Sequence, residues 1–137
     1  MNVSVKSDKV AVDREVHAVY VFLSDFRNFE HLMPEQVVNW KATESECSFT
    51  IKNMGDVAMK MSEKDMDSRI VVTSAGTMPF GFDLKVILEP ADAEKSFVLI
   101  TLEAQMSAML KMMAKRPLQN LVDHMAGKIQ AYYQSPS

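Results

Sequence analysis

The chain is short of cysteine and of long apolar segments, and each shortage excludes a class of protein. A single cysteine among 137 residues cannot form an internal disulfide or an all-cysteine metal site, which is typical of a protein that works in the reducing cytoplasm. No stretch approaches the roughly 20 apolar residues that a membrane-spanning helix needs. The first residues, MNVSVKSDKVAVDREV, alternate apolar and charged side chains and lack the apolar core of a signal peptide. We therefore expect a cytoplasmic protein without a transmembrane segment.

The chain also lacks the short motifs of common catalytic and metal sites. His17, His31 and His124 are not spaced as in an HExxH zinc helix and do not lie near a cysteine pair. No serine sits in a GxSxG elbow. The acidic neighbour Glu46 is expected to raise the pKa of the Cys47 thiol and so to make it a poor nucleophile. We therefore assign no catalytic residue, no metal ligand and no cofactor.

The charge balance argues against a nucleic-acid partner. The net charge is -3, whereas nucleic-acid binding rests on a basic face that neutralises phosphates. The acidic residues between Glu63 and Asp67 lack the glycine and the late glutamate of an EF-hand, so a solvated turn is predicted there. With 47% apolar and 24% charged residues, the composition is that of one globular domain covering residues 1–137.

The N-terminal third predicts a strand followed by two helices. Residues 3–12 alternate apolar and polar side chains, which indicates a strand, bent near Ser7. Asp13 is a suitable N-cap for an amphipathic helix over residues 13–25. Asn28 is a suitable cap for a second, shorter helix, which should end near Met33 because Pro34 disfavours helix in the residue before it.

After Pro34 the apolar period changes to two, and short turns separate the apolar runs. Six strands are predicted, at residues 37–43, 48–52, 56–61, 69–74, 80–88 and 96–106. A long helix follows, with apolar positions that stay in phase from Met106 to Tyr132 across Pro117. This favours one helix kinked at Pro117 over a new helix that begins there.

The order of the elements predicts the fold class, because strands and helices are segregated along the chain. The short links between strands favour antiparallel pairing of consecutive strands. An antiparallel sheet of seven strands should curl through its own twist. The expected fold is α+β, with a seven-stranded curved antiparallel sheet wrapped around the long C-terminal helix and two short helices between the first and second strands.

One segment resembles a known superfamily. The stretch VYVFLSDFRNFEHLMPEQV, residues 19–37, is similar to the first helix pair of the START-like, or Bet v 1-like, superfamily, which includes the SRPBCC and polyketide cyclase/dehydrase-like proteins. The resemblance covers nearly the whole chain and implies the helix-grip fold with a cavity between the sheet and the last helix. It implies no single function, because that superfamily contains binders, carriers, cyclases and partner-binding proteins.

The strand and helix periods indicate which side chains would line such a cavity. The predicted ligand-binding residues are Trp40, Phe49, Ile51, Met59, Met61, Val72, Phe82, Leu84, Met109, Met113, Leu121 and Met125. An apolar gate is predicted at Met78, Pro79 and Phe80. The inward face of strand 96–106 stays open, since Val98, Ile100 and Leu102 on one side and Phe97 and Leu99 on the other are all apolar.

The chain contains twelve methionines, which are flexible and polarisable and suit surfaces that adapt to varied partners. The first hypothesis is a non-catalytic binder of a small hydrophobic molecule such as a lipid, polyketide or isoprenoid-like compound. A second is a polyketide cyclase or aromatase, which would need a titratable group such as Glu103, Asp83, Tyr20 or His31 facing the cavity. A third is a partner-binding module with an exposed apolar patch, and a fourth is a fully packed core.

Overall fold

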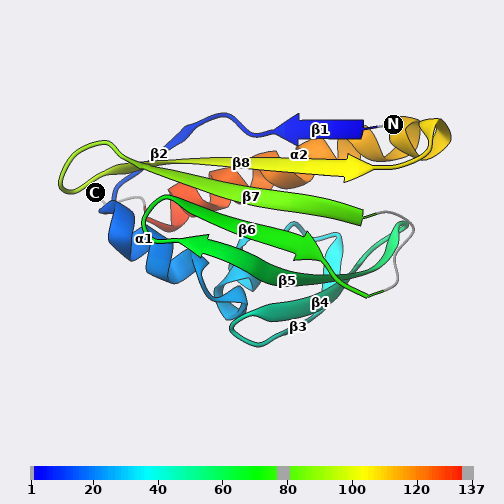
Figure 1. The fold of residues 1–137 in the computed structure, drawn as a ribbon, viewed down its shortest axis with the longest axis horizontal. Helices are drawn as coiled ribbons and strands as arrows, with labels where there is room; N and C mark the ends of the chain where they lie inside the picture. Colours follow the sequence, from blue (N-terminus) through cyan, green and yellow to red (C-terminus); the bar gives the residue numbers. More distant parts are fainter. Residues whose placement is uncertain (1, 77–80, 134–137) are drawn as a thin grey trace.

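The computed structural model describes residues 2–76 and 81–133 (Figure 1). In chain order its elements are β1 (Asn2–Lys6), β2 (Val10–Val12), α1 (Val16–Leu23), the 3-10 helix η1 (Phe26–Leu32), β3 (Val37–Ala42), β4 (Glu46–Ile51), β5 (Gly55–Asp65), β6 (Arg69–Ser74), β7 (Gly81–Pro90), β8 (Ser96–Gln105) and α2 (Ala108–Tyr132). This order confirms the predicted α+β fold with a long C-terminal helix. No helix in the described part of the chain is long and apolar enough to cross a membrane.

The strands form one antiparallel sheet in the order β1-β8-β7-β6-β5-β4-β3, with β2 also paired to β8. The predicted first strand is therefore two short strands on the same neighbour, and the sheet has eight strands rather than seven. Ser7 lies at the bend between them. Its backbone N–H donates to the Ile100 carbonyl at 2.8 Å, and its hydroxyl accepts the Ile100 N–H at 3.0 Å.

Helix α2 runs along the concave face of the sheet, which confirms its predicted position (Figure 1). It is continuous through Pro117, as predicted, and begins where the Ser107 hydroxyl accepts the Leu110 N–H at 3.2 Å. The buried face of α2 consists of Ala114, Leu118, Val122, Met125, Ala126 and Ile129. These side chains join the inward residues of the strands in one core.

Two helix starts differ from the prediction. Helix α1 has its N-cap at Glu15 rather than Asp13, because the chain is still turning there: the Arg14 N–H donates to the Val12 carbonyl at 2.8 Å. Helix η1 is capped by Asp25, whose carboxylate accepts the Arg27 N–H at 2.9 Å. Asn28 instead donates from its side chain to the Phe22 carbonyl at 2.9 Å, so it ties η1 to α1.

Two irregularities move the strand faces. Asn39 has a positive φ of 58° where the register of β3 and β4 shifts. This bulge brings Val37 rather than Val38 onto the core side with Trp40. A second shift near Ser62 lets β5 continue to Asp65, four residues beyond the predicted end of the strand.

The face of β8 that the sequence left open is now assigned. Val98, Ile100 and Leu102 are buried, whereas Phe97 and Leu99 are half-buried on the other face. On β7, Leu84, Val86 and Leu88 are buried, as predicted. The concave side of the sheet is therefore apolar over its central strands, and α2 covers it.

Candidate binding cavity

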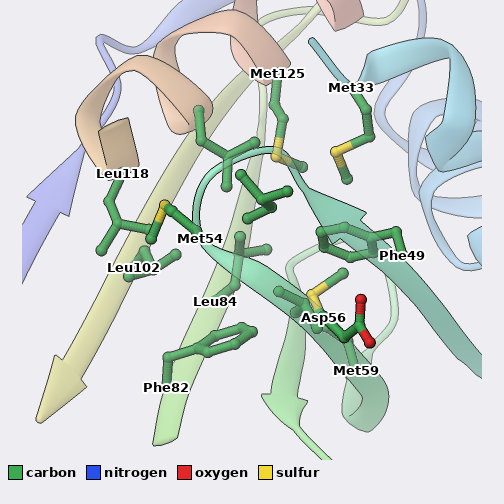
Figure 2. Close-up of a pocket in the computed structure, with 13 residues that line it drawn as sticks. Met33, Phe49, Met54, Asp56, Met59, Phe82, Leu84, Leu102, Leu118 and Met125 are labelled. Atoms are coloured by element: carbon green, nitrogen blue, oxygen red, sulfur yellow. The ribbon is translucent and has the colours of Figure 1, made fainter. Parts of the chain in front are cut away.

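A cavity lies between α2 and the concave face of β4, β5, β7 and β8 (Figure 2). Met33, which caps η1, and Met54, in the turn between β4 and β5, reach the cavity from outside the strands and α2. Its walls are formed by Met33, Phe49, Ile51, Met54, Asp56, Val57, Met59, Phe82, Leu84, Leu102, Leu118, Leu121 and Met125.

The walls are almost wholly apolar. Among the residues that the structure describes, Asp56 is the one lining residue with a polar side chain, and it is exposed, with its carboxylate accepting a hydrogen bond from the Thr50 hydroxyl at 2.7 Å. The space open to the centres of water-sized molecules is about 40 Å³. An apolar void of this kind offers water almost no hydrogen-bonding partner, which favours a dry cavity.

Four methionines contribute to the cavity from four different parts of the chain. Met59 on β5 and Met125 on α2 are 3% and 1% exposed. Met33 and Met54 are half-buried and lie outside regular strands. Figure 2 shows the side chains of Met33 and Met125 extending into the same space from two separate segments. Each has three rotatable side-chain bonds, so the cavity can change shape without movement of the backbone.

The structure places seven of the twelve predicted lining residues around this cavity. They are Phe49, Ile51, Met59, Phe82, Leu84, Leu121 and Met125. Five of the seven lie on strands whose period of two indicated the inward face, and two lie on the buried side of α2. Strand and helix periods therefore predicted seven of the thirteen described residues of the cavity wall.

Three further predicted lining residues lie close to the core but not on the cavity wall. Trp40 stacks on Phe49, with ring centroids 5.2 Å apart. Val72 is fully buried within the core, and Met61 packs against its edge. These side chains support the wall rather than form it.

Met109 and Met113 were predicted to face the cavity, and this was wrong. They are 75% and 70% exposed. The first turns of α2 extend past the ends of β7 and β8 (Figure 1), and Met109 and Met113 lie on the side of these turns that faces away from the core. Over these turns the sheet-facing side of the helix carries Leu110 and Ala114. The predicted gate at residues 78–80 falls outside the described residues.

Six lining residues were missing from the prediction. They are Met33, Met54, Asp56, Val57, Leu102 and Leu118. Val57 shares the inward face of Met59, and Leu118 is in phase with Met125, so the periods could have identified them. Leu102 required the face of β8 to be known. Met33 and Met54 lie outside periodic segments, and no local signal indicates them.

None of the titratable residues considered for catalysis is among the residues lining the cavity. Glu103 and Asp83 are exposed on the opposite face of the sheet. His31 is exposed on η1, and Tyr20 is half-buried on α1. Burial raises the pKa of the Cys47 thiol from 9.0 to about 12, so it is neutral at physiological pH. Burial, and not the neighbouring Glu46 as predicted, is the cause.

The acidic residues around the β5–β6 turn contact arginine and histidine side chains. Arg69 contacts the Glu63 and Asp65 carboxylates at 3.0 and 3.1 Å, and the His17 ring contacts Asp67 at 2.7 Å. No cluster of three or more potential metal ligands occurs in residues 2–76 and 81–133.

Solved structures share this architecture. A START superfamily protein from Mycobacterium smegmatis is 14% identical, with 96% of each chain covered and a TM-score of 0.69. Truncated norcoclaurine synthase from Thalictrum flavum is 10% identical over 100% of this chain and 96% of that chain, with a TM-score of 0.75. The same enzyme in complex with dopamine and hydroxybenzaldehyde is 11% identical over 99% and 90%, with a TM-score of 0.70.

These similarities establish the START/Bet v 1-like fold for this chain and confirm the resemblance seen in its sequence. At identities of 10–14% they establish the fold alone. No family model matches the sequence, and no curated protein matches it.

Proposed function

We propose that the protein binds a small hydrophobic molecule, such as a lipid, polyketide or isoprenoid-like compound, in the cavity beneath α2, and that it does so without catalysis. The observation that carries this proposal is the cavity wall, in which twelve of the thirteen described residues are apolar. Apolar pockets with one or two polar groups are the usual form of small-molecule sites. The single free, buried cysteine supports a cytoplasmic place of action.

The chemistry of the wall favours binding over reaction. Acid–base catalysis needs a titratable group within hydrogen-bond reach of the substrate. The one candidate on the wall is Asp56, which is exposed at the rim and already bonded to Thr50. A hydrophobic guest held by shape and buried area requires no such group.

The volume of the cavity requires that the wall adapt to its guest. Pockets for drug-sized ligands usually measure about 300–1,000 Å³, whereas this space admits only about 40 Å³ of water centres. Met33 and Met54 are the lining methionines with the most freedom because they are half-buried and lie in connecting segments. Rotation of these two side chains would lengthen the cavity towards solvent.

The proposal is tested by native mass spectrometry on protein purified gently from its own host. A reproducible added mass of a few hundred daltons, released on denaturation, is the expected result. Purified protein should also take up the neutral probe N-phenyl-1-naphthylamine and change the fluorescence of Trp40, which stacks on the cavity residue Phe49. A protein that carries no added mass and does not take up this probe would overturn the proposal.

Leu121→Gln tests the location of the site. Leu121 is half-buried on the cavity wall, and an amide there would lose its hydrogen bonds to water when a guest enters. Such a loss costs about 1–3 kcal/mol, so affinity for the probe should fall roughly tenfold or more. Val21→Gln, at a 55% exposed position on α1, is the control. Equal affinity in the two variants would place the probe elsewhere.

A further inference from the structure

The first three turns of α2 carry an exposed surface that the cavity does not explain. Met109, Met112 and Met113 are 75%, 86% and 70% exposed. Lys115 and Arg116 are exposed on the same turns, and Lys111 is half-buried next to them. We call these six residues the methionine–cation face. A contiguous apolar group on a protein surface commonly marks an interaction site, whereas single exposed apolar residues do not.

The fold holds this face away from the rest of the molecule. On the opposite side of the same turns, Ala114 is buried and Leu110 packs against the core. One side of these turns is therefore packed against the core, and the helix extends past the ends of β7 and β8 (Figure 1). The methionines are presented on a rigid element rather than on a loop.

The charge on this face is of one sign. No Asp or Glu occurs from residue 104 to residue 122, in a chain that contains 18 acidic residues. In the part of the chain that the structure describes, Lys111, Lys115 and Arg116 form no ion pair, whereas Lys9, Arg27 and Arg69 each do. The three cations are therefore available to an anionic partner.

We propose that the methionine–cation face docks the protein on an anionic lipid bilayer. A helix that lies on such a membrane presents apolar side chains to the acyl boundary and Lys or Arg to the lipid headgroups. Met109, Met112 and Met113 supply the first component, and the cations supply the second. A second copy of the chain fits less well, because a two-fold contact would bring the cations of one copy against those of the other.

Co-sedimentation with vesicles tests this proposal on the full chain. The protein should bind vesicles of phosphatidylcholine and phosphatidylglycerol in equal parts, and should not bind pure phosphatidylcholine. Each Lys or Arg near such a surface contributes about 1 kcal/mol, so the triple variant Lys111→Gln, Lys115→Gln, Arg116→Gln should bind roughly 100-fold more weakly. Lys52→Gln, Lys60→Gln, Lys95→Gln, with the same change of charge at exposed positions elsewhere, should bind as the wild type.

The apolar component has its own variant. Met109→Gln, Met112→Gln, Met113→Gln keeps side-chain length and helix propensity but should bind at least tenfold more weakly. Met66→Gln, at a 71% exposed position on another surface, is the control. Helix content by circular dichroism verifies that each variant is folded.

Three results would overturn the proposal. The first is no vesicle binding by the wild type. The second is vesicle binding by the Lys111/Lys115/Arg116 variant or by the Met109/Met112/Met113 variant that equals that of the wild type. The third is a dimer of the wild type in sedimentation velocity that the methionine variant abolishes, which would assign the face to a second copy. None of these results bears on the cavity, since all six residues lie outside its wall.

Discussion

Cys47 shows at the scale of one residue how burial decides chemistry in this sheet. Its side chain is on the core side of β4, opposite Met59 on β5, and is 6% exposed. Burial disfavours the thiolate and raises the pKa to about 12. The residue therefore acts as a small apolar side chain within the core and not as a nucleophile.

The raised pKa makes stability depend on alkaline pH. Below pH 9 the thiol is neutral in the folded and the unfolded chain. Between pH 9 and about 12 the unfolded chain loses the proton while the folded chain keeps it, so the free energy of unfolding should fall by about 1.4 kcal/mol per pH unit. Urea unfolding of the wild type and Cys47→Ala measures this, because all other titrating groups are shared. Parallel pH dependences of the two proteins would contradict the assignment.

Single residues also show where prediction from sequence reaches its limit. Met109 and Met113 satisfy the apolar period of α2 as well as Met125 does, yet only Met125 faces the cavity. The spacing of apolar residues predicts which side of a helix is apolar. It does not predict where along the helix the neighbouring sheet ends. Met33 and Met54 line the cavity without belonging to any period, because tertiary folding alone brings the η1 end and the β4–β5 turn together.

At the scale of elements, most boundaries followed from local chemistry. The change of period after Pro34 located all six later strands, and the phase across Pro117 indicated a single helix. The errors at the helix starts have different local causes. Asp13 and Asn28 are good caps by residue type, but Asn28 bonds to the Phe22 carbonyl instead. Period counting also fails at a bulge such as that at Asn39.

Pro117 imposes a cost on α2 that can be measured. It lacks the N–H that would donate to the Met113 carbonyl, and an interior proline costs a helix roughly 3 kcal/mol relative to alanine. Pro117→Ala should therefore raise the free energy of unfolding by about 1–3 kcal/mol. Urea unfolding followed through Trp40 fluorescence measures the change.

Arg116→Ala, at the neighbouring exposed position, is the control and should change stability by no more than about 0.5 kcal/mol. A Pro117→Ala variant that is less stable than the wild type would show that packing of Ala114 and Leu118 against the sheet needs the helix geometry that proline imposes.

At the scale of the whole molecule, element order was enough to predict an α+β fold with the sheet wrapped around the last helix, because a curved antiparallel sheet leaves one apolar concave face for one long apolar helix to cover. The existence of a cavity there does not follow from the same reasoning. The cavity volume is the small difference between the volume enclosed under α2 and the volume of the side chains that fill it. Sequence patterns do not determine that difference. The sequence therefore predicted seven of the residues that line the cavity but not the volume of the cavity.

The methionines permit the most direct measurement of whether this cavity receives a guest. In protein with carbon-13 in the methionine methyl groups, N-phenyl-1-naphthylamine should shift or broaden the signals of Met33, Met54, Met59 and Met125, which line the cavity. The signals of Met66 and Met112, which are 71% and 86% exposed, should stay in place. Changes confined to the exposed methyl groups, or no change in any methyl signal, would show that the interior is a packed core and not a binding site.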